Sequence, residues 1–390
     1  MAHDLADLPR TGLTVQLCGD AHLSNFGLFA APDRRVVFSI NDFDETLPGP
    51  FEWDVARLTA SFAVAGRDRG FDDGVRSDIT MACVRSYREA MTECAERGWM
   101  DLWYDRLEAN KLSGLFLADA TKQQKERFER TVTKSRSKDS LAALAKLTHT
   151  IDGELRFVST PPLVVPIEEL ATSHEATRIS EAVHSLLAAY RGTLQDDRQS
   201  LLERYRYVHL ARKVVGVGSV GTRAWIMLLV GRDSRDPLIL QLKEAQPSVL
   251  EPFLGATASS NHGQRVVHGQ RMMQAASDIL LGWHRTAGID GVERDFYVRQ
   301  LWDAKGSADV DQMIPDGMRR YAKMCGVTLA RAHARSGDPV AIASYLGSGD
   351  AFDRAMSTFA ESYAGQNEID HAALLTAIAS GAVTAAAEPS

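Results

Sequence analysis

The sequence predicts an α+β fold in which a large helical part is combined with a smaller antiparallel sheet. Residues 206–243 alternate apolar runs with glycines and contain a turn at Gly231–Pro237, a pattern typical of three antiparallel strands. Residues 76–150 are rich in helix formers, and Met318–Ala334 places apolar side chains at helical spacing. A chain of 390 residues is long enough for these elements to form two or more packed units.

The composition excludes several classes of protein. Hydrophobic residues make up 45% of the chain and charged residues 24%, which is the balance of an ordinary globular protein. The formal net charge of -7 provides no global basic field to hold nucleic acid or an anionic membrane. The chain shows neither a bilayer-spanning apolar stretch nor a signal-peptide pattern, so we expect a cytoplasmic protein. The cysteines form no CxxC pair, which argues against a zinc site or a disulfide framework: Cys18, Cys83, Cys94 and Cys325.

The N-terminal segment predicts two strands followed by a helix. Leu13–Cys18 and Arg35–Ile40 read as strands that could pair as a hairpin, with a turn at Pro32-Asp33. Residues 46–50 contain two prolines and a glycine and predict a loop. Residues Glu52–Arg67 follow a helical period.

Further elements follow along the chain. The highly charged residues Lys122–Lys138 predict a mobile surface segment within a helical region. The other expected elements are helix over 174–205, a helix over about 264–284, a strand at Phe296–Leu301, and helix from Met318 to about Ala379.

Polar side chains follow the first two predicted strands. Asp20, His22 and Asn25 come after the first strand, and Asp42 and Asp44 come after the second. If the strands pair, these groups converge at one end. Carboxylate and amide oxygens suit Mg²⁺, and a carboxylate that is not committed to the metal could take a proton from a hydroxyl. Two alternatives stay open: a pair of Asx-rich turns, and a metallophosphoesterase site, although the chain has no Gly-Asn-His element to supply further ligands.

A second constellation lies far downstream. A G-x-G-x-x-G pattern leads into a strand, as expected of a glycine-rich hairpin that covers nucleotide phosphates rather than of a Rossmann turn; it consists of Gly216, Val217, Gly218, Ser219, Val220 and Gly221. Lys243 ends the second apolar strand after this pattern and is a candidate phosphate ligand. The alternatives are an ordinary hairpin turn and a solvent-facing lysine.

The spacing of the first constellation resembles a known family. The pattern G-D-x-H-x-x-N, then a strand, then D-F-D is similar to the catalytic loop and metal-binding motif of the kinase-like fold, closest to aminoglycoside phosphotransferases and choline kinases. The resemblance implies that Asp20 is the base, that Asn25 and Asp42 bind the metal with Asp44 as a further ligand, and that His22 orients the catalytic loop.

Three positions complete or depart from this resemblance. Asp54 matches a structural aspartate of those kinases, whereas Cys18 stands where they carry a histidine. The kinase lysine normally pairs with a helix glutamate, but the helix after Lys243 contains none. Gln264, Gln270, Gln274 and the upstream Glu251 are the polar candidates, and the sequence assigns no partner.

The order of the motifs is inverted relative to ordinary kinases, because the catalytic loop precedes the glycine-rich loop. The resemblance therefore implies a circularly permuted, two-lobe protein-kinase-like fold with a helical C-lobe and a small antiparallel-sheet N-lobe. We expect the end of the helix Met318–Ala334 to lie near Leu13–Cys18, and Phe296–Leu301 to be the hinge strand. The segments are 1–75 with the catalytic loop and metal site, 76–205 as helical C-lobe, 206–305 as N-lobe, and 306–390 as a return to the C-lobe.

Nearly the whole chain also resembles a bacterial family catalogued only as a domain of unknown function. The shared features appear here as GDAHLSNFG, NDFDETLPGPFEWD, ARKVVGVGSVGTR and LQLKEA. This second resemblance implies no activity.

The function implied by the motifs is phosphoryl transfer from ATP, with Mg²⁺, to a hydroxyl of a small-molecule acceptor. Transfer of AMP to a protein and a non-catalytic nucleotide-binding role remain alternatives. We expect the helical segment 76–205 to form part of the acceptor wall, and Asp20 and Lys243 to face one cleft although 223 positions separate them. The sequence indicates no oligomeric state.

Overall fold

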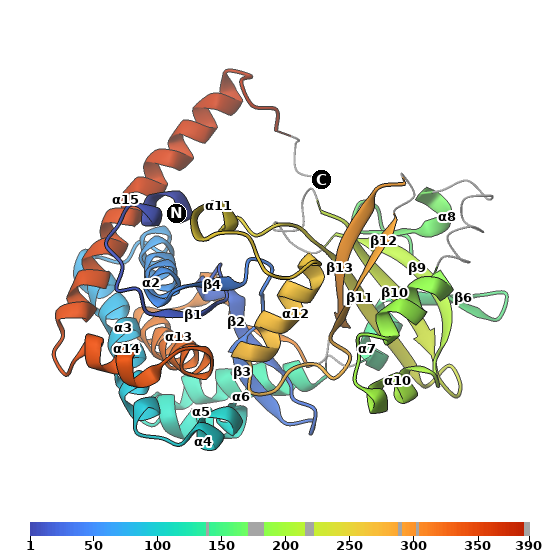
Figure 1. Cartoon of the computed structure of the whole chain (residues 1–390), viewed down its shortest axis with the longest axis horizontal. Coiled ribbons are helices and arrows are strands. Elements are labelled where there is room, and N and C mark those ends of the chain that lie inside the picture. The colour runs from blue at the N-terminus through green and yellow to red at the C-terminus, as the bar shows by residue number, and fades with distance from the viewer. Residues whose placement is uncertain (138–139, 171–182, 215–221, 288–290, 302–303, 386–390) are drawn as a thin grey trace.

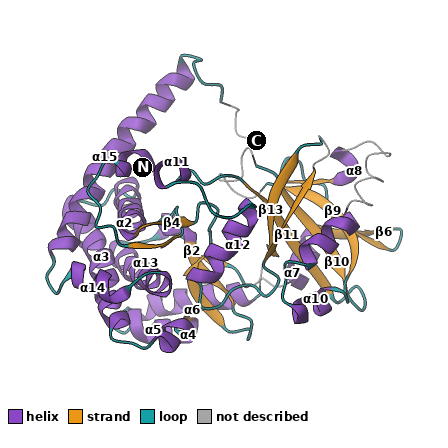
Figure 2. Ribbon diagram, viewed as in Figure 1, coloured by secondary structure: helices purple, strands orange, loops and turns teal. Residues whose placement is uncertain are grey.

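The computed structural model describes residues 1–137, 140–170, 183–214, 222–287, 291–301 and 304–385. A helical part lies beside a part built on a twisted sheet (Figures 1 and 2). The predicted α+β class is confirmed, and the paired strands are antiparallel. No helix among these residues is long and apolar enough to cross a membrane.

The larger sheet has six strands in the order β12-β13-β11-β10-β9-β8. Its bounds are β8 Val164–Pro166, β9 Arg206–Lys213, β10 Ala224–Val230, β11 Pro237–Ala245, β12 Gly282–Ala287 and β13 Glu293–Gln300. The three strands predicted within 206–243 are therefore confirmed as β9, β10 and β11. Leu238, Leu240 and Leu242 face the helical residues 183–191, whereas Ile239 packs with α7 (Ser140–Leu147) on the other face. Because side chains alternate along a strand, Lys243 shares the face of Ile239.

The predicted helix over 264–284 is only half right. Helix α12 spans His262–Met273 and packs on β12, β13 and β1, and the chain then returns as strand β12. The helix ends at Gln274, whose side-chain amide donates to the carbonyl of Ile40 at 2.6 Å. This contact with a distant strand replaces the next helical turn, and it is invisible in the local pattern.

The predicted hairpin of residues 13–18 and 35–40 is wrong. Strand β1 (Thr14–Leu17) pairs with β4 (Leu47–Pro50), and β2 (Phe26–Ala30) pairs with β3 (Val36–Ile40). The predicted loop at 46–50 is thus mostly strand, because a proline is tolerated where a strand has one neighbour. As a result, residues 18–25 run from β1 to β2 and residues 41–46 run from β3 to β4. Both loops connect the same two strand pairs and lie side by side.

The remaining strands and short helices complete the two parts. Strands β14 (Gly306–Ser307) and β5 (Leu107–Glu108) flank β2 and β3 in a four-stranded sheet. The other short elements are η1 Leu23–Asn25, β6 Thr148–Ile151, β7 Glu154–Phe157, α8 Ile167–Leu170, α10 Asp196–Leu202, α11 Glu251–Leu254 and η3 Val310–Gln312.

The helical part packs around the helix pair α3 and α13. Its helices are α1 Ala2–Ala6, α2 Phe51–Asp68, α3 Asp73–Ala95, α4 Trp99–Tyr104, α5 Ala109–Phe116, α6 Lys122–Arg136, α13 Pro315–Ser336, α14 Pro339–Leu346 and α15 Ala351–Ala379. At Gly326 of α13, an added Cβ would lie 2.3 Å from the carbonyl oxygen of Cys83 in α3. Glycine therefore allows the two helices to approach closely.

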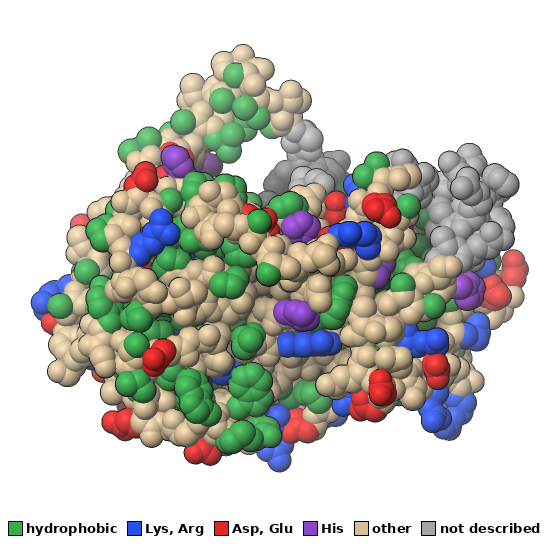
Figure 3. Space-filling model, viewed as in Figure 1, with side chains coloured by type: hydrophobic (Ala, Val, Ile, Leu, Met, Phe, Trp, Pro, Cys, Tyr) green, Lys and Arg blue, Asp and Glu red, His purple; other side chains and the backbone are tan. Residues whose placement is uncertain are grey.

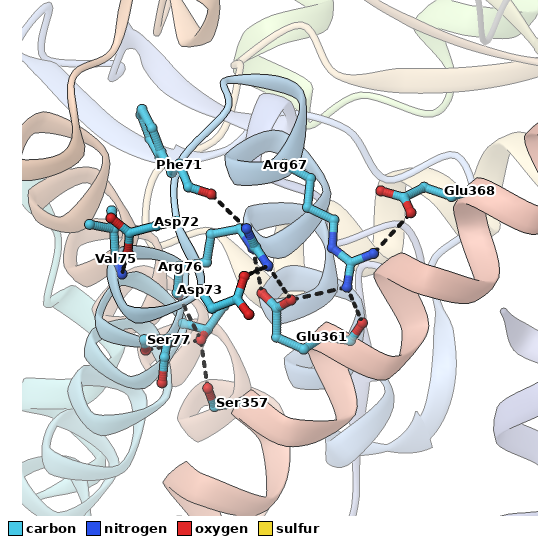
Figure 4. A network of polar contacts seen from close by, with 11 residues as sticks. Arg67, Phe71, Asp72, Asp73, Val75, Arg76, Ser77, Ser357, Glu361 and Glu368 are labelled. Atoms are coloured by element: carbon cyan, nitrogen blue, oxygen red, sulfur yellow. Dashed lines mark hydrogen bonds and ion pairs between the residues drawn. The ribbon is translucent and has the colours of Figure 1, made fainter.

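The C-terminal helix α15 is held to α2 and α3 by an ion-pair network (Figure 4). Arg76 donates from Nε and Nη2 to the two carboxylate oxygens of Glu361, each at 3.0 Å. Arg67 donates to the same carboxylate at 3.1 Å and pairs with Glu368 about two turns further along α15. Such bidentate guanidinium–carboxylate contacts specify geometry as well as contributing energy, so the network defines how α15 lies on the body.

The charged segment predicted to be mobile is helix α6 in its described residues. Thr121 caps its N-terminus, and the side chains of Thr121 and Gln124 satisfy each other's backbone N–H groups in a capping box. The amide of Gln124 also donates to Asp316 of α13 at 3.0 Å. These caps and a tertiary contact stabilise a helix that has few apolar residues of its own.

Asp316 is expected to make folding stability depend on pH in the acid range. Burial alone would raise its pKa, but hydrogen bonds from Arg320, Arg319 and Gln124 lower the pKa from 3.8 to about 2. A lowered pKa in the folded state stabilises the protein above the ordinary value, and this contribution is lost as the pH falls from about 4 towards 2. Urea unfolding midpoints of the wild type and Asp316→Asn should therefore differ at pH 7 and converge near pH 2.

The matched control is Asp311→Asn, an exposed acid in η3. It should change the unfolding midpoint little at any pH. If the midpoint difference between the wild type and Asp316→Asn stays constant from pH 7 to pH 2, ionisation of Asp316 does not contribute to stability as expected.

The surface in Figure 3 carries Lys and Arg side chains interspersed with Asp and Glu. Hydrophobic side chains gather along the lower edge of this view, where Figure 1 shows α4 and α5. Exposed apolar residues of these helices include Trp99, Met100, Tyr104 and Leu115.

Candidate functional site

The two loops that follow β1 and β3 touch along their length. The backbone N–H of Asn41 donates to the carbonyl of Asn25 at 2.8 Å. At Gly19, with φ of 88°, a Cβ would lie 2.3 Å from the carbonyl oxygen of Glu45. Glycine is required there both for the left-handed backbone and for the close approach. The polar residues predicted on the two loops are therefore brought together, although by a different strand pairing from the one expected.

The carboxylate of Asp20 is oriented from two sides. Arg57 of α2 donates from Nε to Asp20 Oδ1 at 2.8 Å, and its Nη2 lies 2.8 Å from the same oxygen. His22 Nε2 lies 3.5 Å from the other oxygen, Oδ2. Asp20 is half-buried, so its side chain remains partly accessible from outside.

His22 is positioned as a neutral imidazole. Its Nδ1 accepts a hydrogen bond from the backbone N–H of Ser24 at 3.3 Å and caps the short helix η1. An accepting Nδ1 leaves the proton on Nε2, on the side of Asp20. Burial, with a smaller effect of Arg57, lowers the pKa of His22 below its ordinary value despite the nearby carboxylates. At neutral pH the ring therefore orients the loop and Asp20 without adding charge.

Asn25 links Asp20 to the second loop. Its side-chain Nδ2 donates to the backbone carbonyl of Asp20 at 2.9 Å. Its backbone carbonyl accepts a hydrogen bond from the backbone N–H of Asn41. The amide nitrogen is thereby committed to the loop, and the amide oxygen is the atom of Asn25 that can serve as a ligand.

Lys243 of β11 reaches the two aspartates of the second loop. Its Nζ donates to Asp44 Oδ2 and lies 3.8 Å from Asp42 Oδ2. Lys243 itself is buried at 6% exposure. Burial alone would lower its pKa, but Tyr297, Asp42 and Asp44 outweigh burial and raise the pKa above its ordinary value. Lys243 is therefore a fully charged lysine facing carboxylates rather than solvent, which excludes the alternative of a solvent-facing side chain.

The partner that the sequence did not assign to Lys243 is thus the D-F-D segment. Helix α12 instead contributes Arg265, which donates to the backbone carbonyls of Asp44 and Thr46 at 2.8 and 2.7 Å. It also donates to the carbonyl of Gln246 at 2.8 Å, just after β11. Arg265 is almost fully buried and ties the second loop to the sheet. Sequence reasoning missed it because an arginine in a helix gives no local sign of such contacts.

A second missed residue is Arg299 of β13. It donates to Gln241 Oε1 at 3.1 Å and to the carbonyl of Asn41 at 3.2 Å. Gln241 is 3% exposed, and its Nε2 is buried without a hydrogen-bond partner. Burial alone would raise the pKa of Asp42, but Lys243 and Arg299 outweigh burial and lower it. Two cations therefore keep Asp42 ionised.

Asp54 holds the first loop from behind. It is 1% exposed and accepts hydrogen bonds from the backbone N–H groups of Cys18 and Gly19 at 2.8 and 3.1 Å. His333, near the end of α13, lies with Nε2 3.3 Å from Asp54, and its Nδ1 is 2.9 Å from the hydroxyl of Tyr87. The structural role predicted for Asp54 matches this geometry. His333 was not singled out as part of the network, because only the tertiary contact connects the two residues.

Cys18 occupies the position of the expected histidine without replacing its chemistry. Its side chain is 1% exposed. Burial, reinforced by Asp54, raises the pKa of the thiol well above its ordinary value, so it stays protonated. Cys18 therefore acts as an apolar core residue.

The residues predicted to bind a metal fit Mg²⁺ by their chemistry. Asn25, Asp42 and Asp44 offer hard oxygen atoms, and Asp44 Oδ1 is buried without a hydrogen-bond partner. Among the described residues, no group of three His, Cys, Asp or Glu side chains could hold a metal ion. Mg²⁺ is usually held by one or two carboxylates together with substrate phosphates, so two aspartates and an amide suffice.

The glycine-rich stretch Gly216–Gly221 lies outside the described residues. Its flanking strands β9 and β10 are adjacent in the sheet, and Ala224 at the start of β10 is paired with Lys243.

Comparison with known proteins identifies a family without a described activity. A family model described as "Uncharacterized protein conserved in bacteria (DUF2252)" matches residues 1–377. No curated protein matches the chain, and no solved structure does. Because the match covers nearly the whole sequence, the chain belongs to this uncharacterised bacterial family, DUF2252.

Proposed function

We propose that the protein transfers a phosphoryl group from ATP to a hydroxyl of a small molecule, with Mg²⁺ as the cofactor. The observation that carries the proposal is the contact of Lys243 with Asp42 and Asp44, across 199 positions in the case of Asp44. A buried lysine facing two aspartates, one of which has an unpartnered buried oxygen, is the charge arrangement that a metal–phosphate complex requires.

Each residue has a role in this proposal. Asp20 accepts the proton of the acceptor hydroxyl, with Arg57 and His22 holding its carboxylate in place. Asn25, Asp42 and Asp44 would hold Mg²⁺, which would supply positive charge to neutralise the phosphate oxygens. In the presence of nucleotide, Lys243 exchanges its aspartate contacts for phosphate oxygens. Catalysis then rests on positioning and charge stabilisation.

We also propose that the chain is a circularly permuted two-lobe kinase-like fold. Two contacts and the position of one residue support this reading. Ser336 at the end of α13 accepts a hydrogen bond from the backbone N–H of Gln16 in β1 at 3.1 Å, as expected if this helix leads into the catalytic loop. Lys243 lies on the third of the consecutive strands β9–β11. Asp54 binds the backbone of the loop that carries Asp20.

The test uses ATP labelled on either the α- or the γ-phosphate, with Mg²⁺ and a set of small alcohols. Transfer of the γ-label to an alcohol is the expected result. Retention of the α-label on a protein product would instead indicate AMP transfer. Binding of Mg·ATP without transfer of either label would indicate a non-catalytic protein, and the absence of nucleotide binding would overturn all three readings.

Lys243→Met is expected to weaken the affinity for Mg·ATP by about tenfold or more, because a charge-assisted contact to phosphate is removed from a buried site. Isothermal titration with a non-hydrolysable ATP analogue measures this. The control is Lys323→Met, the same change at a half-buried lysine of α13 away from the loops. Equal affinities of the wild type and Lys243→Met would remove Lys243 from the nucleotide site.

A further inference from the structure

A cavity of about 290 Å³ opens directly beside Asp20. It lies between α1, the start of α2 and the segment that precedes α11; Figure 1 shows the N-terminus beside α11 and α2. Seven of the eleven residues that line it are apolar, among them Leu5, Leu17, Trp53 and Leu250. Its size is close to the lower end of small-molecule sites, which begin at roughly 300 Å³.

The three charged side chains that line this cavity, Asp20, Asp54 and Arg57, already have partners. Asp54 faces two backbone N–H groups and His333, and one oxygen of Asp20 accepts from Arg57. Arg57 in turn contacts Asp20 through both Nε and Nη2. The cavity lining therefore offers Asp20 Oδ2 to a ligand but no cluster of carboxylates. In an acceptor whose hydroxyl occupies Asp20 Oδ2, a positive charge elsewhere in the molecule would have to leave water without a matching carboxylate, which is costly.

We propose that this cavity binds the acceptor, and that the acceptor is an alcohol with a mainly apolar body and no positive charge. The inference rests on the proposed phosphotransferase function and deepens it. In the reaction the acceptor oxygen forms a bond to the γ-phosphorus, the bond from that phosphorus to the β–γ bridging oxygen breaks, ADP leaves, and the hydroxyl proton passes to Asp20.

This assignment separates the protein from enzymes that act on aminoglycosides or choline, whose acceptors are cations. It also places the wall of the acceptor site in a different part of the chain from the one predicted. The lining residues come from residues 1–57 and 249–250, whereas the sequence suggested the helical segment 76–205. The relocation follows from the close approach of α1 and the 249–250 segment to the first loop.

The test uses two alcohols of equal size that differ in one charge: 4-ethylbenzyl alcohol and 4-(aminomethyl)benzyl alcohol. Their dissociation constants are measured by ligand-observed NMR, and their phosphorylation is followed with γ-labelled ATP. We expect the neutral alcohol to bind about tenfold or more tightly than the ammonium alcohol, since an unpaired charge must be desolvated in the second case.

A pair of variants on α1 ties binding to the cavity. Ala2 lines the cavity and Ala6 does not, and both are half-buried. Ala2→Leu is expected to weaken binding of 4-ethylbenzyl alcohol by about tenfold, because the larger side chain takes up space in the cavity. Ala6→Leu should not change this affinity. Both variants should bind Mg·ATP as the wild type does, which shows that they are folded.

The outcomes separate the inference from the function. Equal or tighter binding of the ammonium alcohol, no effect of Ala2→Leu, or failure of the neutral alcohol to bind would overturn the inference, even if another acceptor is phosphorylated. Cavity binding with the expected charge preference, but without transfer of the γ-label to any acceptor, would overturn the phosphotransferase function and leave the ligand class of the cavity standing.

Discussion

Asp20→Asn is expected to lower the rate of phosphoryl transfer by about 10²–10⁴-fold, the range typical of losing a general base. Asparagine has nearly the same shape, and its oxygen can still accept the hydrogen bond that Arg57 donates to Asp20 Oδ1. It cannot, however, take the proton of the acceptor hydroxyl. The affinity for Mg·ATP should stay unchanged, because Asp20 is assigned to the acceptor side of the site. Single-turnover kinetics with γ-labelled ATP and nucleotide titration measure the two quantities separately.

The control for Asp20→Asn is Asp68→Asn, an exposed aspartate at the end of α2. It should leave both transfer rate and affinity as in the wild type. Full turnover by Asp20→Asn would remove the assignment of the base. Loss of nucleotide affinity in this variant would instead place Asp20 on the metal side of the site.

Asp353→Ala is expected to lower the free energy of unfolding by about 3–5 kcal/mol, the range for breaking one partner of a buried ion pair. Asp353 of α15 is 0% exposed and binds Arg88 of α3 through both oxygens, Nε to Oδ1 at 3.0 Å and Nη2 to Oδ2 at 2.8 Å. Arg88 is buried as well, so the truncation leaves its guanidinium group without its hydrogen-bonded carboxylate in a poorly hydrated environment. Urea unfolding followed by circular dichroism measures the loss.

Two further variants identify the cause of this destabilisation. Asp350→Ala removes the exposed partner of Arg354 in the same helix and should cost less than about 1 kcal/mol. The double variant Arg88→Met/Asp353→Leu removes both charges and should recover much of the stability lost in Asp353→Ala. If the double variant is as unstable as Asp353→Ala, packing rather than the unpaired charge explains the loss.

Patterns within one element were the most reliable part of the sequence-based prediction. The three strands β9–β11 and the helix α13 followed from apolar periodicity, because each buries one face against the rest of the protein. The prediction failed where a long-range contact ended or created an element. Gln274 stops α12 by donating to Ile40, and β4 forms because β1 pairs with it. Neither partner is adjacent in the sequence.

The candidate site shows the same difference between what local patterns predict and what long-range contacts decide. Residue type and spacing were enough to propose the site residues Asp20, Asn25, Asp42 and Asp44. A metal and proton-transfer site of this kind depends on a few residue types at a fixed spacing. Arg265 could not, because its three carbonyl partners are defined only by folding. The strand pairing assumed in the prediction was wrong, yet the loops still meet, since both connect the same two strand pairs.

The sequence by itself therefore determined that this protein is an α+β member of the DUF2252 family, and which polar residues are candidates for its chemistry. Only the tertiary structure decided that Lys243 faces Asp42 and Asp44, and that a cavity with several apolar lining residues lies beside Asp20. The physical reason is that the apolar periodicity of a segment reflects only which face of that one helix or strand is buried. A charge pair across 199 positions, or a cavity lined from two distant segments, depends on how elements pack against one another.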